Sequence, residues 1–310
     1  MSLVAALAAS WVVAGQALRP LDTMTETVEA IGSAQDLRRR LPEATVRDEV
    51  GRLTEAFNGM MGRLDDAYRR LEEALDSQRQ FVADASHELR TPLTSIRANL
   101  GLLMSRSDIS AADRAEALQD MDAESRRMSR LAADLLTLAR ADAGQRLEMA
   151  PVDLPRLGDE VVRRARRAYP GRHFGFSRER ALRVWGNADS LRQLLWILLD
   201  NAARHTDGGA RAHVTIDAGP GTVRLVVTDD GRGIPPADQE RVFERFYRAD
   251  PARSTGGAGL GLSIARWIVE QHGGRISVAN SGHSGGAAFT VELPAAPAEK
   301  RRNVTRAGNS

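Results

Sequence analysis

Residues 81–103 read FVADASHELRTPLTSIRANLGLL, and they carry the clearest structural signal in the chain. Apolar side chains recur here mostly three or four positions apart, at Phe81, Ala85, Leu89, Leu93, Ile96, Leu100 and Leu103. That spacing is typical of one face of an α-helix, so we expect a helix across this stretch.

A second helix is expected to follow after a short turn. The turn is predicted at Ser105 to Ser110, and Ser110 is a suitable N-cap residue. The helix beyond it carries a similar seam at Leu118, Met121, Ser125, Met128, Leu131, Leu135 and Leu138. Two apolar seams in one helical hairpin predict a four-helix bundle built by two copies of the chain.

The region before residue 73 also has helical periods. Pro20 opens a short amphipathic segment that reaches Ile31, and a break is expected at Leu41-Pro42. After Gly51 the spacing alternates between three and four, as in a coiled coil, at Leu53, Phe57, Met60, Leu64, Ala67 and Leu71. Two such helices joined by a connector predict a small parallel bundle that needs a second chain. A plain coiled-coil spacer would explain the helical patterns of this region and of the hairpin, except around residue 87.

Residues 3–18, LVAALAASWVVAGQAL, form an almost wholly apolar run. As a helix, such a run would rise about 24 Å, slightly less than the roughly 30 Å hydrocarbon core of a bilayer. No basic residue precedes it, and Arg19 follows it, which favours a membrane helix with that end in the cytoplasm. A signal-peptide core and a buried helix are the alternatives.

The composition changes at Ala143-Gly144. Short strand-like runs are expected at 183–185, 212–216, 223–228, 275–279 and 288–293. Helical runs at 154–168, 189–205 and 260–272 alternate with them. This order predicts an α/β sandwich with a mixed sheet, followed after Pro297 by a disordered basic tail.

The composition excludes several kinds of chemistry. The chain has no cysteine, and Lys300 is its only lysine. Cysteine nucleophiles, disulfides, a Walker A loop and the strand lysine of a protein kinase with a Gly-rich loop are therefore ruled out. The net charge of +2 and the aromatic content of 5% also argue against a dedicated nucleic-acid surface.

His87 is the first candidate for a reactive side chain. It lies two positions from both Ala85 and Leu89, so a helix turns it about 200° away from the apolar seam. Thr91 lies one turn further along the same face, and Pro92 removes a helical hydrogen bond nearby. An imidazole is a competent nucleophile at neutral pH, although most isolated surface histidines have no role.

A second candidate site lies in the α/β region. Asn201, Arg204 and His205 are spaced to share one helix face. The Asn201 amide offers an oxygen ligand for Mg²⁺, and Arg204 has the charge to reach a phosphate. These residue types are common on helix surfaces, so this set alone is weak evidence.

Two glycine motifs follow. Asp229, Gly231 and Gly233 come directly after a predicted strand, which is also the pattern of a simple turn. Gly257, Gly259 and Gly261 open the helix expected at residue 260, and helix N-termini bind phosphate. The glycines do not follow the first strand of a βαβ unit, so a Rossmann fold is not indicated. The segment between the motifs, which holds Arg245, Arg248 and Arg253, is expected to form a mobile lid.

Together these motifs resemble the cytoplasmic part of bacterial sensor histidine kinases. SHELRTPLTSIR (86–97) is similar to the family's H box, LLDNAARHT (198–206) to its N box, DDGRGIP (229–235) to its first glycine box, VFERFYR (242–248) to its F box and GGAGLGLSIA (256–265) to its second glycine box. Residues 20–72, with Pro20 and DEVGRL at 48–53, more loosely resemble a HAMP signalling linker.

The resemblance implies roles for these residues. His87 would be the phosphoacceptor, Glu88 its general base, and Thr91 would position water for dephosphorylation of the partner. Asn201 would bind Mg²⁺, Arg204 the ATP phosphates and Asp229 the adenine amine. The nucleotide would also be lined by His205, Gly231, Gly233, Gly257, Gly259, Leu260, Gly261 and Leu262. The phosphoryl group would pass to an aspartate of a response regulator.

The implied organisation is a homodimer at the bacterial cytoplasmic membrane. The expected parts are a membrane helix at 1–18, a HAMP-like linker at 19–72, a phosphotransfer hairpin at 73–143, an ATP-binding domain at 144–296 and a tail at 297–310. We expect no periplasmic sensor domain in these residues.

Three positions depart from the family pattern. Ile197 stands where the family often has a second asparagine, His205 where it often has tyrosine or phenylalanine, and Ala287 where threonine is common. These departures leave open a non-catalytic or phosphatase-dominant homologue. Another ATPase of the same superfamily is a further alternative, although such ATPases lack the H box.

Overall fold

The structure is a computed structural model, and it describes residues 4, 7, 11, 40–41, 49–105, 109–179, 182–206, 211–249, 257–281 and 285–296. The chain divides into two units, Met1–Ala83 and Asp84–Ser310. The predicted membrane run 3–18, of which only Val4, Leu7 and Trp11 are described, lies otherwise outside the described residues, as do the segment 20–31 and the tail 297–310. Among the described residues, no helix has the length and apolar character needed to cross a bilayer.

In the first unit, helix α2 begins at Glu49 and presents two different faces. Thr54, Met61 and Asp65 are buried, and the Asn58 side chain exchanges two hydrogen bonds with the backbone of Leu41, at 2.9 and 3.0 Å. The predicted coiled-coil seam lies on other positions and is largely exposed, at Leu53, Met60, Leu64 and Leu71. Among the described residues of this unit, the predicted seam therefore has no packing partner.

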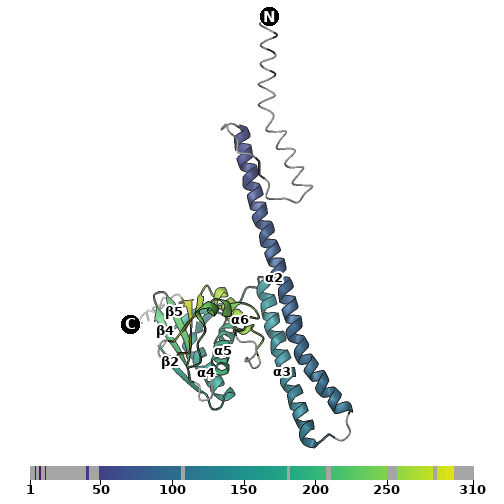
Figure 1. The fold of residues 1–310 in the computed structure, drawn as a ribbon. Helices are drawn as coiled ribbons and strands as arrows, with labels where there is room; N and C mark the ends of the chain where they lie inside the picture. Colours follow the sequence, from purple (N-terminus) through teal and green to yellow (C-terminus); the bar gives the residue numbers. More distant parts are fainter. Residues whose placement is uncertain are drawn as a thin grey trace, which may run out of the picture. The chain divides into compact units, whose positions relative to one another are not determined.

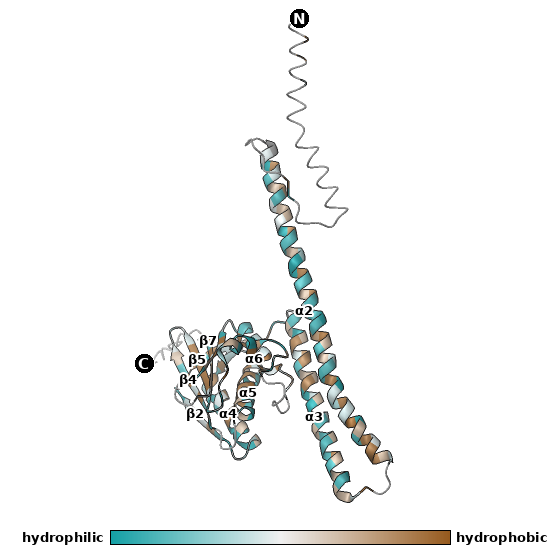
Figure 2. Cartoon of the chain, viewed as in Figure 1, coloured by the Kyte–Doolittle hydropathy of each residue, from teal (hydrophilic) through white to brown (hydrophobic). Residues whose placement is uncertain are grey.

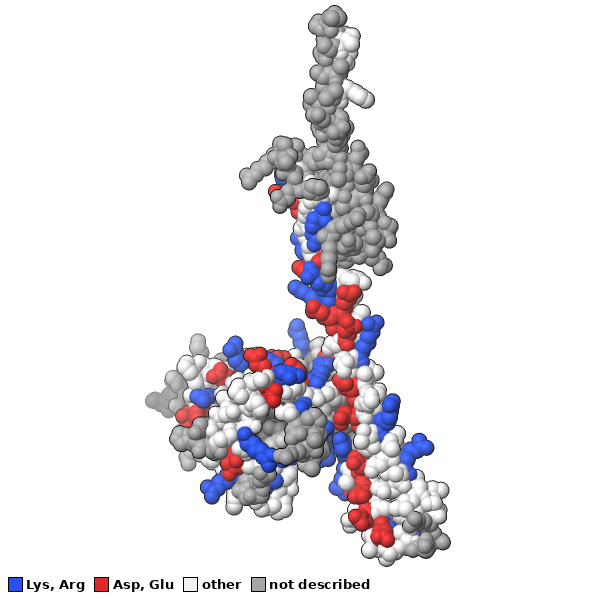
Figure 3. Space-filling model, viewed as in Figure 1, with Lys and Arg blue, Asp and Glu red and all other residues white. Residues whose placement is uncertain are grey.

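The hairpin of the second unit follows the prediction closely. Helix α2 (Glu49–Ser105) continues through Pro92, and helix α3 (Ala111–Asp142) begins after Ser110. The Ser110 hydroxyl accepts a hydrogen bond from the Asp113 N–H at 3.1 Å, which confirms the expected N-cap. Figure 1 shows α2 and α3 side by side, and acidic and basic side chains are interspersed along them on the face in Figure 3.

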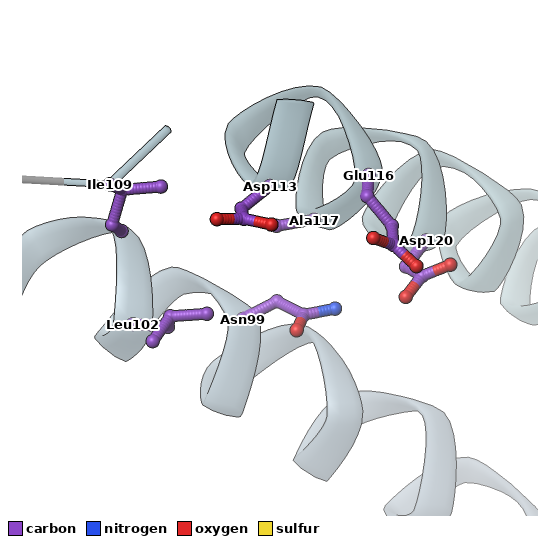
Figure 4. A pocket seen from close by; sticks show the side chains of 7 residues that line it. All are labelled: Asn99, Leu102, Ile109, Asp113, Glu116, Ala117 and Asp120. Carbon is purple, nitrogen blue, oxygen red and sulfur yellow. The ribbon is translucent and has the colours of Figure 1, made fainter. Parts of the chain in front are cut away.

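An open hollow lies between α2 and α3 next to their connecting turn (Figure 4). Asn99 and Leu102 line it from α2, and Asp113, Glu116 and Asp120 line it from α3. Asn99 is twelve residues from His87, or about 18 Å along the helix. The hollow is therefore separate from His87.

The C-terminal domain contains a mixed five-stranded sheet in the order β2-β4-β5-β7-β6. Only β2 and β4 pair in parallel, and the other neighbours are antiparallel. Their bounds are β2 (His173–Arg178), β4 (Arg211–Gly219), β5 (Thr222–Asp229), β6 (Arg275–Asn280) and β7 (Ala287–Pro294). A separate two-stranded sheet pairs β1 (Ala150–Asp153) with β3 (Arg183–Gly186).

Three helices form the second layer, and their apolar sides meet one face of the sheet (Figures 1 and 2). They are α4 (Leu154–Ala168), α5 (Ala188–Arg204) and α6 (Gly261–Gln271). Alternate residues of the central strands are buried beneath them, at Val214, Ile216, Val223, Leu225, Val227, Phe289, Val291 and Leu293. Two 3-10 turns, η1 (Pro236–Asp238) and η2 (Arg241–Phe243), precede α6. The predicted α/β sandwich with a mixed sheet is confirmed.

A buried histidine joins α6 to the start of α5. The Asn187 N–H donates to His272 Nε2 at 3.0 Å, and His272 Nδ1 lies 2.6 Å from the Ile268 carbonyl oxygen. These partners require a neutral ring with its proton on Nδ1. Burial lowers the pKa of His272, because water no longer stabilises the charged ring. Asn187 also caps α5, so the neutral ring helps to fix this helix.

We expect acid to destabilise the ATP-binding domain through His272. In the unfolded chain His272 takes up a proton below about pH 6.5, whereas in the folded domain the lowered pKa keeps the ring neutral to a lower pH. The unfolded state therefore binds more protons in this range, and the free energy of unfolding falls as the pH falls towards the folded pKa. Urea unfolding at pH 7.5 and 5.5 should show a smaller acid-induced loss in His272→Gln than in the unsubstituted chain. Equal losses in the two proteins would contradict this role for His272.

Candidate functional site

The H-box residues lie on α2 as expected, but their side chains have different environments. His87 is exposed, whereas Glu88 is half-buried. The Thr91 hydroxyl lies 3.5 Å from the His87 carbonyl oxygen, one turn back on the same helix. The Glu88 carboxylate forms an ion pair with Arg127 of α3, at 3.4 Å. Arg127 lies outside every sequence motif, so its pairing with Glu88 emerges only from the structure.

Helix α5 carries the proposed metal ligand near its C-terminal end. Asn201 is half-buried, and within the described residues its side-chain amide has no hydrogen-bond partner. One turn earlier, Ile197 lies against the start of α6: a Cβ on Gly261 would be 3.3 Å from its Cγ2 atom. Ile197 therefore packs against the second glycine motif and offers no oxygen ligand.

Arg204 is held by a small network that sequence analysis missed. Its Nε donates to Asp200 Oδ2 at 2.7 Å, and the Tyr169 hydroxyl donates to Asp200 Oδ1. Burial, and then the hydrogen bond to Asp200, raises the pKa of Tyr169 to about 12, so this hydroxyl stays protonated at neutral pH. Asp200 thus holds the Nε edge of the Arg204 guanidinium in place.

Helix α5 ends at Arg204, and His205 is its C-cap residue rather than a full member of the predicted helical face. Its N–H donates to the Asn201 carbonyl at 3.1 Å. His205 is exposed, yet the protein around its ring desolvates it and lowers its pKa, and the charge of Asp229 partly offsets this. The surroundings of the ring therefore favour its neutral form.

Asp229 ends strand β5 and is buried, with 8% of its surface exposed. Its Oδ1 atom accepts hydrogen bonds from the N–H groups of Gly231, at 2.9 Å, and Ala287, at 3.0 Å. Gly286 is required beside it, because a Cβ there would lie 2.0 Å from the Asp229 carbonyl oxygen. The backbone of Ala287 makes this contact, so the absent threonine side chain does not remove it.

The first glycine motif is held in place by Asn280, which was not predicted from the sequence. Gly233 has a φ of +70°, and a Cβ there would lie 2.6 Å from the Gly285 carbonyl oxygen. The Asn280 side chain, at the end of β6, accepts a hydrogen bond from the Ile234 N–H at 2.7 Å. The end of β6 and the residue Gly285 just before β7, both distant in sequence, therefore hold this turn in place.

The second glycine motif opens α6 as predicted. Gly259 has a φ of +71°, and a side chain there would collide with the backbone of Phe246 and Tyr247 in the F box. Leu260 is the N-cap position, and only 1% of the residue is exposed, so its side chain packs into the domain core. Gly257 is exposed, and Leu262 is half-buried. The predicted lid lies partly outside the described residues.

The fold brings the N box and both glycine motifs together. Gly231 lies against the carbonyl oxygen of His205, and Gly261 lies against Ile197, so the end of α5 contacts the end of β5 and the start of α6. The two glycine motifs and the buried Asp229 carboxylate thus lie near the end of the helix that carries Asn201 and Arg204. Such a set can bind a purine nucleotide with its phosphates at a helix N-terminus.

Three family models match the chain in order. Residues 12–66 match the HAMP domain and residues 77–144 match the His Kinase A (phospho-acceptor) domain. Residues 186–297 match the histidine kinase-, DNA gyrase B- and HSP90-like ATPase. A phosphoacceptor domain is thus followed in the chain by an ATPase domain of the histidine-kinase type. The chain therefore has the domain composition of a two-component sensor histidine kinase.

Among its curated relatives is the signal transduction histidine-protein kinase/phosphatase MprB of Mycobacterium avium (strain 104). It is 37% identical over 319 residues, which cover 100% of this chain and 59% of the relative. The chain thus spans a little over half the length of the MprB relatives that it matches.

Two solved structures extend the comparison. Full-length ShkA in complex with AMPPNP is 28% identical, with a TM-score of 0.53 over 70% of this chain and 46% of that one. Histidine kinase ThkA in complex with the response regulator protein TrrA is 24% identical, with a TM-score of 0.60 over 76% of this chain and 67% of that one. The second likeness concerns the fold alone.

Proposed function

We propose that the chain is a sensor histidine kinase that phosphorylates His87 from ATP and passes the phosphoryl group to a response regulator. The observation that carries this proposal is the exposed His87 beside Glu88 on a hairpin, in the same chain as an α/β sandwich with two glycine motifs. Other ATPases of the superfamily are less well supported, because residues 77–144 match a phosphoacceptor domain.

The proposed reaction is a direct phosphoryl transfer. One ring nitrogen of His87 attacks the γ-phosphorus, forming an N–P bond while the bond to the β,γ-bridging oxygen breaks and ADP leaves. Glu88 accepts the proton from the other ring nitrogen. Because the ring is exposed on a helix surface, a nucleotide carried by the ATP-binding domain can approach it without displacing core residues.

The nucleotide would be recognised mainly by fixed groups. Asp229 is buried and oriented by two N–H groups, which suits acceptance of a hydrogen bond from the adenine amine. Arg204 keeps part of its guanidinium for the phosphates, while Asp200 fixes the remaining edge. The glycines that start α6 place backbone N–H groups beside the phosphates.

The site also fits a magnesium ion. Asn201 presents an amide oxygen, a suitable hard ligand, and Mg²⁺ normally completes its shell with phosphate oxygens and water. Because Ile197 supplies no second ligand, Asn201 would be the main protein ligand. When bound, the ion would offset negative charge on the phosphates during transfer.

A phosphatase activity towards the phosphorylated regulator belongs to the same proposal. Thr91 lies one turn from His87, and the M. avium relative is named a kinase/phosphatase. Ile197 and Ala287 do not favour a non-catalytic protein, since Ile197 packs into the fold and the Ala287 backbone still orients Asp229. We therefore propose both activities for one chain.

We also propose that the chain acts as a homodimer at the bacterial cytoplasmic membrane. The apolar seam of α2 is exposed in a single chain, and a second copy would bury it in a four-helix bundle. The apolar run 3–18 would provide the anchor. Light scattering should give twice the chain mass, and deletion of 1–18 should release the protein from membranes; a monomer, or an unaltered distribution, would contradict these points.

Phosphotransfer profiling tests the function most directly. The purified chain should take up label from γ-labelled ATP and Mg²⁺ and then lose it, within seconds to minutes, to one member of a panel of response regulators. An Asp→Asn substitution at the acceptor of that regulator is the control and should block the transfer. Label that never leaves the kinase for any regulator of the panel would contradict the proposal.

A further inference from the structure

The side chain of Glu88 is directed towards the neighbouring helix and not towards the exposed ring next to it. Successive residues of a helix point about 100° apart, and Glu88 uses its direction to meet α3. Its carboxylate is 3.4 Å from Arg127, and both side chains are only about one-quarter exposed. In this arrangement Glu88, the proposed general base, is paired with the guanidinium of Arg127.

Arg127 has a second carboxylate within reach. Glu124, one turn earlier on α3, approaches the other terminal nitrogen of Arg127 at 4.0 Å. Within the described residues, the Glu124 Oε2 atom is buried and accepts no hydrogen bond. A buried carboxylate oxygen without a donor favours the movement of a guanidinium towards it. Glu88 and Glu124 therefore compete for one arginine.

The backbone at Glu88 is also less constrained than the rest of α2. Pro92 lies inside the helix, and proline has no N–H group. The Glu88 carbonyl, four residues earlier, therefore receives no helical hydrogen bond. A small change of backbone at this turn costs less than elsewhere in the helix, so the side chain can redirect.

We propose that Arg127 is a positioning residue that restrains Glu88 and thereby limits how often Glu88 can accept the proton of His87. The restraint is released when Arg127 turns fully to Glu124. This inference rests on the proposed kinase function and adds to it a control element from α3. Movement of α2 relative to α3 would shift Arg127 between its two partners.

Two charge-neutralising variants of the full chain are expected to act in opposite directions. Arg127→Gln frees Glu88 and should raise the limiting rate of His87 labelling at saturating ATP. Glu124→Gln removes the competitor, strengthens the Glu88–Arg127 pair and should lower the same rate. Partly exposed ion pairs are worth up to about 1 kcal/mol, so each change should be about two- to fivefold. The KM for ATP should not change.

Two further variants separate this role from a structural one. Arg127→Lys keeps the charge and should give a rate between those of Arg127→Gln and the unsubstituted chain. Arg126→Gln is the matched control, because among the described residues Arg126 pairs only with exposed Asp122 on its own helix, at 2.8 Å; its rate should be unaltered. Helix content measured by circular dichroism verifies folding, and Glu124→Gln carries the test by itself where Arg127→Gln does not fold.

The outcomes are distinct. Lower rates in both Arg127→Gln and Glu124→Gln would show that Arg127 only supports the hairpin, and would overturn the proposal. Equal effects of Arg126→Gln and Arg127→Gln would overturn it as well. Absence of label in the unsubstituted chain would refute the kinase function itself, which is a separate result.

Discussion

Replacement of His87 by alanine is expected to abolish labelling of the chain by γ-labelled ATP. The imidazole is the proposed nucleophile, and no cysteine is available to replace it. In the unsubstituted chain the label should be acid-labile and base-stable, as expected for a phosphorus–nitrogen bond. Gel autoradiography after acid and base treatment measures both properties, and the loss in His87→Ala should reach background.

His173 provides the matched control for this experiment. It is an exposed histidine at the start of β2, outside both candidate sites, so His173→Ala should label normally. ATP binding by His87→Ala should also be unaltered, because His87 lies outside the nucleotide-binding residues. Acid-labile label that persists in His87→Ala would refute the assignment of the phosphoacceptor.

Replacement of Asp229 by asparagine is expected to weaken ATP binding by about 10- to 100-fold. An asparagine can still accept the two N–H groups with its oxygen, so the domain should fold. Its amide nitrogen, however, would face the adenine amine as a second donor. Loss of a hydrogen bond to a charged acceptor costs about 1.5–3 kcal/mol, which gives this range of affinity.

Asp230 allows the same chemical change to be made one residue away. Its carboxylate accepts a hydrogen bond from the Arg211 N–H at 2.9 Å at the surface. Calorimetric titration with a non-hydrolysable ATP analogue should show nearly unaltered affinity in Asp230→Asn. Equal affinities in Asp229→Asn and the unsubstituted chain would remove Asp229 from the adenine site.

Elements with strong local signals were predicted well. Helix α4 has the predicted bounds, Leu154 to Ala168, because a side-chain cap and a first-turn proline reinforce its apolar periodicity. Asp153 provides that cap by accepting from the Arg156 N–H at 3.0 Å. The two ends of the predicted turn are also confirmed, since α2 ends at Ser105 and Ser110 caps α3, while residues 106–108 lie outside the described residues.

Strands β1 and β2 were missed, and both depend on distant partners. β1 has four residues with one buried side chain, and it forms only by pairing with β3, about thirty residues later. β2 contains Gly175, where a side chain would meet the ring of His213 on β4. A short strand lacks enough alternation to be seen in sequence when its stability comes from its neighbour.

In the candidate sites, too, the residues with a local sequence signal were predicted and those that depend on distant contacts were not. The motifs predicted the residues to which we assign catalysis and nucleotide binding. The roles of these residues stay predictions, and so do the domain limits 19–72, 73–143 and 144–296. The motifs did not indicate which residues hold these site residues in place. Those supporting residues are Arg127, Tyr169, Asp200, Asn280 and Gly286. These act through contacts between segments 30 or more residues apart, or through the space left by an absent Cβ.

The sequence by itself determined that the chain has a helical hairpin with an exposed histidine and an α/β domain with two glycine motifs. These properties follow from local spacing, because helix periodicity and glycine conformation depend on near neighbours. Only the tertiary structure decided that Glu88 meets Arg127 across the hairpin and that Asp229 is oriented by Ala287. The physical reason is that hydrogen-bond and ion-pair geometry is set by which distant segments pack together, and that packing has no local sequence signature.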